Sequence, residues 1–519
     1  MNKSFEWNNI CFVVDGKPTS IISGEFHYFR VPKSAWRERL ILLKESGANT
    51  VATYIPWIIH EPREKEILFD DIPERSLTDF LKLCCELDIM VIARPGPYAY
   101  SELWHDGLPF WLAQDYPETL AHGPKGEKHK TLFNASYLHP VFLEKARRYI
   151  RAVDEKIRPF LITNGGCIIS VQADNEIGGI HVWRGYLDCN VEAMGFGKEN
   201  GHYVRFLKEK YKSIELLNER YGSEYHDFTD VLPFENTPDD STVEGKRFAC
   251  DYRKFYKSTL EIYIKTLCSW FCEDGIDVGY CTNAGNPPFI PMLRDIPKQN
   301  EKYQFHMGVD HYYAGEDGNM TADKVVKYGA SLDMLDALGL PASVWEMQSG
   351  AATCSPPILN EPLSCFYMTH IAFGMKRSNY YIFTGGPNFE NTGTNTEIYD
   401  YHAPVSATGE VRPIYYAQKE SNEYSNENPW LLTTPRCCDV QLGFDWELLE
   451  ASSPGPWKRY SRDSIKLWRY NSALQLTLGL SARLFKYKDI CGELDIDIPL
   501  IVACDERMAK EKQELLEFR

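Results

Sequence analysis

The chain has 519 residues, of which 44% are hydrophobic and 25% charged, an ordinary balance for a globular protein with a large core. This length predicts one large domain and at least part of another. The formal net charge of −17 argues against nucleic acids and anionic membranes as partners, while a neutral substrate remains compatible with it.

The N-terminal sequence MNKSFEWNNI has no apolar segment of the kind found in signal peptides, and no stretch is long enough to span a bilayer. The 15 cysteines are scattered and show no compact spacing typical of a zinc site. We therefore expect reduced, mostly buried thiols in a cytoplasmic protein.

Over the first 420 residues, short apolar runs alternate with helical patterns. Eight such runs, nearly all separated by helices, indicate a (β/α)8 barrel rather than an open sheet. Helices are expected at Ala35–Glu45, Leu77–Leu87 and Val141–Ile157, and around His202–Tyr221 and Tyr252–Phe271. Strands are expected at Ile21–Phe26, Thr50–Trp57, Ile89–Ala93, Cys167–Glu176, Val278–Thr282, Val309–Tyr313, Ser343–Glu346 and Tyr380–Phe383.

After about residue 420 the pattern changes. The segments predict a helix at Ala473–Tyr487, a buried strand at Leu500–Cys504 and a charged amphipathic helix at Met508–Phe518. A sheet domain that stopped there would be incomplete. We therefore expect a barrel domain over residues 1–420, and a linker with part of a smaller α/β domain over residues 421–519 of a truncated chain.

Two predicted strands end in a glutamate. The run before Glu176 is apolar and β-branched, as in a strand buried on both faces, and the run before Glu346 is similar. The carboxyl ends of barrel strands are where such folds place their chemistry. Glu176 alone is equally compatible with a salt bridge to a helix, but the second glutamate favours a catalytic pair.

Hydrolysis of a glycosidic bond uses two carboxyl groups in this way. One donates a proton to the leaving oxygen, and the other, roughly 5–5.5 Å away, attacks and retains the anomeric configuration. The fourth and seventh strands face each other across a barrel mouth, so Glu176 and Glu346 can approach one sugar from two sides. Asn175 is well placed to donate to the hydroxyl beside the reacting carbon.

The chain resembles glycoside hydrolase family 35, the β-galactosidase family, in the clan of retaining barrel glycosidases. The resemblance covers the whole expected barrel in the correct order. The stretches that carry it are SGEFHYFRVP (Ser23–Pro32), TYIPWIIHEP (Thr53–Pro62), RPGPYAYSELWHDGLPFWL (Arg94–Leu112), NGGCIISVQADNEIGG (Asn164–Gly179) and YDYHAPVSATGEVR (Tyr399–Arg412).

This resemblance implies a retaining exo-β-glycosidase without cofactor or metal, with Glu176 as general acid/base and Glu346 as nucleophile. It also implies that Tyr313 hydrogen-bonds the nucleophile, and that Tyr54, Glu102, Tyr381 and Tyr399 hold sugar hydroxyls. From the residues alone, a core position is the commoner case for isolated tyrosines such as Tyr54 and Tyr381, whereas a sugar contact is favoured over a loop salt bridge for Glu102. Arg94 is expected to form an ion pair inside the barrel mouth.

Some positions depart from the family pattern. Tyr100-Ser101 stands where a small pair is usual before Glu102, Gln348 where a tyrosine is usual, and His402 where an aspartate is usual. Each lies near the surface that would recognise the sugar. A β-galactoside is the first expectation, and an exo-β-glucosaminidase or another β-glycoside specificity is the alternative.

Two readings from other classes remain. A catalytically inactive barrel that binds carbohydrate would have no need of both glutamates, and a metal-dependent hydrolase would need a tighter His/Asp cluster than His27, His60 and His311 provide. The tail weakly resembles the α/β domain that follows the barrel in family 42 β-galactosidases. That resemblance implies contacts between copies, and therefore a homo-oligomer.

Overall fold

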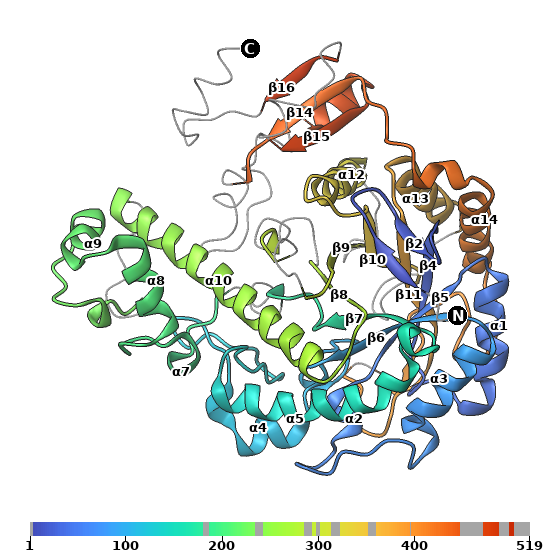
Figure 1. Ribbon diagram of the computed structural model, residues 1–519, viewed down its shortest axis with the longest axis horizontal. Coiled ribbons are helices and arrows are strands. Elements are labelled where there is room, and N and C mark those ends of the chain that lie inside the picture. Colours follow the sequence, from blue (N-terminus) through green and yellow to red (C-terminus); the bar gives the residue numbers. More distant parts are fainter. Residues whose placement is uncertain are drawn as a thin grey trace.

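The protein is a closed barrel of eight parallel strands surrounded by helices, as seen in a computed structural model (Figure 1). The structure describes residues 4–179, 186–233, 242–284, 293–296, 302–312, 322–350, 360–394, 396–446, 471–486 and 498–502. Around the barrel the strands follow one another in chain order, and the last pairs with the first. They are β4 (Ile21–Phe26), β5 (Thr50–Tyr54), β6 (Met90–Gly96), β7 (Ile168–Ala173), β8 (Gly279–Asn283), β9 (Phe305–His311), β10 (Ser343–Gln348) and β11 (Arg377–Thr384).

The predicted (β/α)8 barrel is therefore confirmed, with shifted strand ends. The second strand stops at Tyr54, and a short helix begins at Trp57 after Pro56, whose missing N–H cannot join a ladder. The sixth strand begins four residues earlier than predicted, because His306 and Gly308 interrupt the apolar pattern but are nevertheless buried in the barrel.

The barrel interior is packed rather than open. The Arg377 guanidinium lies 3.3 Å from the centre of the Trp345 ring, and both side chains are buried. Gly308 makes room for this ring, since a Cβ at that position would lie 1.2 Å from Trp345 Cδ1. The chemistry is therefore confined to the end of the barrel where the strands terminate.

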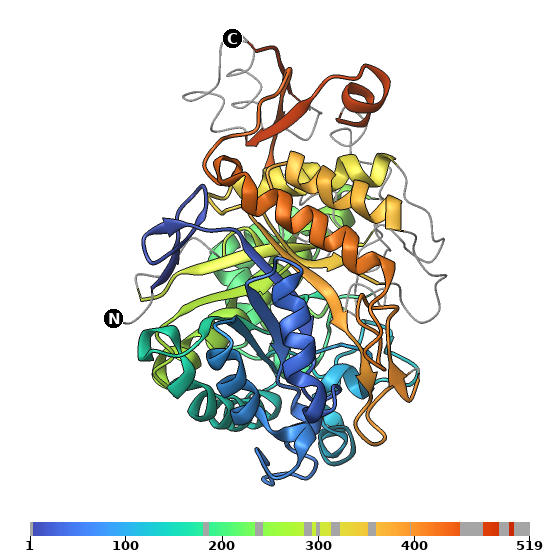
Figure 2. The ribbon, with the colours of Figure 1, turned by 90° about the vertical axis from the view of Figure 1, so that its right-hand side faces the viewer.

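Helices cover the outside of the barrel (Figures 1 and 2). The predicted segment His202–Tyr221 is two helices, because Lys212 at φ +64° interrupts it. The α-helices of the described residues are α1 (Trp36–Glu45), α2 (Trp57–His60), α3 (Leu77–Glu86), α4 (Phe110–Asp115), α5 (Pro140–Ile157), α7 (Val191–Met194), α8 (His202–Tyr211), α9 (Ile214–Tyr221), α10 (Val243–Glu273), α12 (Ala322–Asp336), α13 (Asn360–Ala372) and α14 (Pro413–Glu427). Within the described ranges, none of the helices combines the length and apolarity needed to cross a membrane.

Two small sheets flank the barrel. At the N-terminus, β1 (Phe5–Trp7), β2 (Phe12–Val14) and β3 (Lys17–Pro18) form an antiparallel sheet whose Trp7 ring contacts His306 of β9. Two further strands, β12 (Gly386–Pro387) and β13 (Ile398–Tyr399), form a hairpin beyond β11.

The C-terminal part contains a three-stranded parallel sheet in the order β15–β14–β16, which lies beside α12 (Figure 2). Its strands are β14 (Val440–Phe444), β15 (Ala482–Lys486) and β16 (Leu500–Val502). Arg436 pairs with Asp333 of α12 and anchors this part to the barrel.

The helix predicted at Ala473–Tyr487 is wrong over its second half. Only Ala473–Thr477 is helical, and Gly479 at φ +67° separates it from β15. Ala482 and Leu484 are buried at a spacing of two, which is the strand period. The strand predicted at Leu500–Cys504 is present over Leu500–Val502, but Ile501 is 37% exposed at a sheet edge rather than buried. The predicted helix Met508–Phe518 lies outside the described residues.

Candidate active site

Two glutamates face each other across the barrel mouth. Glu346 lies within β10, and Glu176 stands in the turn after β7. One carboxylate oxygen from each, together with one from Asp310 on β9, lie within 4.8 Å of one another. This separation suits a retaining pair, whose carboxyl groups are roughly 5–5.5 Å apart.

Four donors surround the Glu346 carboxylate. Its Oε1 accepts from Arg94 Nη2 at 2.7 Å, from the Tyr54 hydroxyl at 3.2 Å and from Asn283 Nδ2 at 3.3 Å. Its Oε2 accepts from the Tyr312 hydroxyl at 2.9 Å. Such donors stabilise an ionised carboxylate and hold it in one orientation, as a nucleophile requires.

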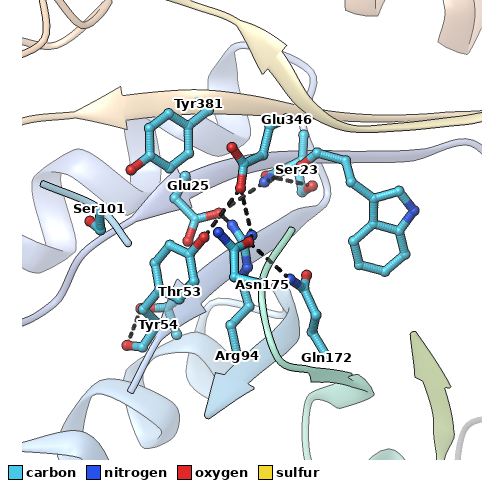
Figure 3. A network of polar contacts seen from close by, with 12 residues as sticks. Ser23, Glu25, Thr53, Tyr54, Arg94, Ser101, Gln172, Asn175, Glu346 and Tyr381 are labelled. Atoms are coloured by element: carbon cyan, nitrogen blue, oxygen red, sulfur yellow. Dashed lines mark hydrogen bonds and ion pairs between the residues drawn. The ribbon is translucent and has the colours of Figure 1, made fainter. Parts of the chain in front are cut away.

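Arg94 connects this carboxylate to a second one deeper in the barrel (Figure 3). Its Nη1 donates to Glu25 Oε2 at 2.7 Å, and its Nη2 donates to Glu346 and, at 2.6 Å, to Asn175 Oδ1. Arg94 and Glu25 are fully buried. Although burial opposes it, the Arg94 charge lowers the pKa of Glu25 to about 2, so Glu25 is a permanent counter-ion.

Glu176 has the opposite surroundings. Desolvation raises its pKa well above the ordinary value, and the negative charges of Glu346 and Asp310 raise it further. Arg94 is the group that opposes this shift. A carboxyl that stays protonated at neutral pH can act as a general acid, whereas the four donors around Glu346 suit a nucleophile.

The turn that carries Glu176 is fixed by its neighbour Asp174. The Asp174 carboxylate accepts from the backbone N–H of Tyr98 at 3.0 Å and of Asn175 at 2.8 Å. Asp174 and Glu176 adopt positive φ values of +58° and +42°, which non-glycine residues rarely do. Strained backbone of this kind is common where a side chain must be aimed at a substrate.

A second polar cluster forms the wall of the mouth beside β11, the strand that pairs with β10. The Tyr399 hydroxyl donates to Glu102 Oε2 and lies 3.0 Å from the Tyr381 hydroxyl. Desolvation raises the pKa of Glu102, while Tyr399 and Arg30 oppose that shift. The Arg30 guanidinium lies 3.9 Å from the centre of the Tyr399 ring and fixes its position.

Glu102 reaches this wall through an unusual turn. Tyr100, Ser101 and Glu102 have φ values of 51°, 52° and 49°, so three consecutive residues wind left-handed. Arg30 holds the turn by donating to Ser101 Oγ at 2.7 Å and to the Ser101 carbonyl at 2.6 Å.

The structure thus brings most residues singled out from the sequence to one mouth. Tyr54 donates to Glu346, and Asn175 shares the Arg94 guanidinium with it. Glu102, Tyr381 and Tyr399 form the wall beside β11. Tyr313 lies outside the described residues. The tyrosine that donates to Glu346 is its neighbour Tyr312, and Arg94 forms the ion pair expected of it.

The three residues that depart from the family pattern differ in their contacts and burial. The Tyr100 hydroxyl donates to the Glu176 carbonyl at 3.4 Å and therefore lies beside the acid. Gln348 is buried and donates to the Gly350 carbonyl. His402 is half-buried, with a positive φ of 48°.

Sequence reasoning missed four residues of the site: Glu25, Asn283, Asp310 and Tyr312. Asn283 and Asp310 stand at or near the ends of strands β8 and β9, and Tyr312 follows directly after β9. A polar residue at the carboxyl end of each predicted strand was therefore the available signal. Glu25 gives the same signal, because it is the last residue but one of β4, as Asp310 is of β9.

The same carboxyl cluster is where, among the described residues, a metal ion would find carboxylate ligands. Glu176, Asp310 and Glu346 could each offer one oxygen. Glu346 already accepts N–H groups from Arg94 and Asn283, however, and Asp310 accepts one from Asn283. A cation would have to displace these donors. The donor set fits a hydrogen-bonded carboxyl pair better than a metal centre.

Residues 11–209 match the family model for glycosyl hydrolases family 35. The chain is therefore similar to this family over these residues. It is 29% identical to the exo-β-D-glucosaminidase of Thermococcus kodakarensis over 91% of the chain and 58% of that protein. It is 30% identical to a β-1,2-glucosyltransferase of Ignavibacterium album over 83% of the chain and 60% of that protein.

Other similarities agree with this assignment. A β-galactosidase of Felis catus is 35% identical over 79% of the chain and 47% of its own length. The crystal structure of a β-galactosidase from Marinomonas ef1 has the same fold, with a TM-score of 0.71, 16% identity, and coverage of 96% of this chain and 74% of that one. The chain spans about three fifths or less of the curated relatives described here.

Proposed function

We propose that this chain carries the catalytic site of a retaining exo-β-glycosidase, and that the group it removes is a terminal β-galactosyl residue. The observation that carries the proposal is the contrast between two carboxyls whose oxygens lie within 4.8 Å. Four donors face Glu346, whereas desolvation and neighbouring charges raise the pKa of Glu176. One group can attack while the other donates a proton.

The reaction would proceed in two steps. Glu346 attacks the anomeric carbon as Glu176 gives its proton to the leaving oxygen, which forms a glycosyl-enzyme ester and releases the aglycone. Glu176 then takes a proton from water, which attacks the same carbon and releases Glu346. The Glu102, Tyr381 and Tyr399 wall can bind hydroxyls on the far side of the sugar ring.

The orientation of Asn175 bears on the choice of sugar. Its Oδ1 accepts from Arg94 Nη2 at 2.6 Å and from Gln172 Nε2 at 3.3 Å, so the amide oxygen is engaged. The amide NH2 is left to donate to the substrate, and a donor requires an acceptor. A neutral hydroxyl next to the anomeric carbon satisfies it, whereas a protonated amine offers no lone pair.

The second candidate is an exo-β-glucosaminidase, which the names of relatives from Thermococcus kodakarensis and Pyrococcus horikoshii favour. The acidic mouth would tolerate a cationic sugar, although the Asn175 NH2 could not donate a hydrogen bond to its protonated amine. One relative is named a glucosyltransferase, so transfer to a second sugar should be measured beside hydrolysis.

The test is release of nitrophenol from nitrophenyl β-galactoside and β-glucosaminide by the protein and by its Glu346→Gln variant. We expect turnover of the galactoside, a loss of about 10⁴-fold or more in the variant, retention of configuration in the NMR spectrum of the first product, and no effect of a chelator. Preference for the glucosaminide would establish the second candidate. Binding of sugars without turnover of either substrate would support a carbohydrate-binding barrel instead.

A further inference from the structure

A third carboxyl group stands beside the catalytic pair. Asp310 is the residue of β9 that lies opposite Glu346 in the parallel ladder between β9 and β10. Its side chain is 2% exposed, so it belongs to the floor of the mouth rather than to its surface. The two-step reaction above gives this carboxyl no task.

Asn283 reveals how charge is distributed among the carboxyls. Its Oδ1 accepts from the backbone N–H of Glu176 at 2.8 Å and from Gln172 Nε2 at 3.1 Å, which fixes the orientation of the amide. Its Nδ2 therefore points the other way, and it donates to Asp310 Oδ2 at 2.9 Å and to Glu346 Oε1 at 3.3 Å. These N–H groups favour the ionised forms of Asp310 and Glu346.

Asp310 also lies beside Glu176, since one carboxylate oxygen of each is within 4.8 Å of the other. Asp310 Oδ1 is buried and accepts no hydrogen bond from the described residues. Desolvation and the charge of Glu346 raise the pKa of both Asp310 and Glu176 well above the ordinary values. The hydrogen-bonding interaction between the two side chains raises the pKa of Glu176 further and opposes the upward shift of Asp310, as the Asn283 amide also does. Two adjacent carboxylates in a desolvated site cannot both ionise without a large cost, so the pair holds one proton.

We propose that Asp310 is a positioning residue that keeps the shared proton on Glu176, with Asn283 holding Asp310 in its ionised form. This inference rests on the proposed function of Glu176 as the acid/base. In the first step the proton leaves Glu176 for the aglycone oxygen, and Asp310 keeps its charge. The two adjacent carboxylates then make Glu176 a stronger base toward the attacking water, which returns the proton.

Other charged or titratable groups also act on Glu176, and they come from several elements. Arg94 opposes protonation, Glu346 favours it, and nearby tyrosine hydroxyls remain neutral because burial raises their pKa well above 10. These groups are Arg94 on β6, Tyr100 in the following loop, Tyr312 after β9, Glu346 on β10 and Tyr401 after β13.

The test is the pH dependence of Asp310→Asn, which removes the charge and keeps the shape. The basic limb of kcat/KM requires protonated Glu176. We expect its midpoint to fall by about one pH unit or more in the variant, and so activity above that midpoint to fall about tenfold. The carboxyl infrared band that titrates in the parent and disappears in Glu176→Gln should move by the same amount.

The matched control is Asp154→Asn, because Asp154 is a fully buried aspartate on α5 that interacts with another carboxyl, Asp274, outside the mouth. It should leave both midpoints unchanged. Asp310→Ser provides a second neutral replacement if the asparagine variant fails to fold. Lower kcat with unmoved midpoints would overturn the proposal. A shifted infrared titration in a protein that turns over no glycoside would uphold the proton assignment and refute the proposed function.

Discussion

The two sides of the barrel mouth stabilise opposite states of the same functional group. Glu346 lies among four donors, including a guanidinium, and these stabilise negative charge. Glu176 has a carboxyl group as its interacting neighbour, and desolvation raises its pKa. Since both residues are glutamates, the division of labour comes entirely from the side chains that neighbouring strands bring to each.

The largest effect should come from removing the acid. Glu176→Gln should lower kcat/KM for alkyl β-glycosides by about 10²–10⁴-fold, because their leaving groups need a proton. Dinitrophenyl glycosides need little protonation, so their first step should be far less affected. Comparison of the two substrates in a stopped-flow assay measures this, with Glu261→Gln on α10 as control. Equal losses on both substrates would assign Glu176 another role.

Removing the arginine should disturb the nucleophile side and the fold together. Arg94→Met leaves Glu25 and Glu346 buried without their shared cation, which should cost about 3–5 kcal/mol in the free energy of unfolding. Urea denaturation measures this. Arg37→Met, which removes an exposed pair with Glu86, should leave the urea midpoint nearly unchanged. Comparable losses in both variants would contradict the ion-pair assignment.

The Glu25–Arg94 pair should also give the fold a dependence on acid. The pKa of Glu25 is lowered from 4.5 to about 2, so its contribution to stability is fully present above about pH 4.5 and is lost as the pH falls through about 2. In Arg94→Met the folded-state pKa of Glu25 should move up from about 2, so this acid-dependent loss of stability should become smaller. Thermal melts from pH 6 to pH 2 test this, and parallel curves for the two proteins would refute it.

A single donor to the nucleophile should have a smaller effect. Tyr312→Phe removes the hydrogen bond to Glu346 Oε2 at 2.9 Å and should lower kcat by about 10–150-fold, the range for a hydrogen bond to a charged group. Tyr380→Phe is the control, because that buried hydroxyl donates to Asn422 on α14, away from the mouth. If both variants lose the same activity, Tyr312 acts through packing.

The smallest effect is expected on the wall beside β11. Tyr399→Phe removes a neutral donor from Glu102 and should raise KM about threefold to tenfold with little change in kcat. Tyr399 also opposes the raised pKa of Glu102, so the acid limb of 1/KM should move to higher pH in the variant. A change confined to kcat would place this wall in the chemistry rather than in binding.

The sequence was sufficient for the barrel because alternation of apolar runs and helices reflects a local requirement, namely burial of both sheet faces. It was sufficient for Glu176 and Glu346 because each ends an apolar run that was predicted as a strand. It was not sufficient for Asp310 and Asn283, whose importance comes from pairing across strands more than 100 residues from Glu176. Ala473–Tyr487 was predicted as one helix because the helical period was applied to a short helix and to the strand that follows it.

The guanidinium shared between Glu25 and Glu346 bears on the covalent intermediate. When Glu346 becomes an ester it gives up its charge, and an arginine that served it alone would be left as an isolated cation in a dry barrel. Glu25 prevents this, because it stays ionised and bound to Arg94. Glu25 therefore neutralises Arg94 throughout the reaction. Glu346 can lose and regain its charge in each turnover without leaving an unpaired cation inside the barrel.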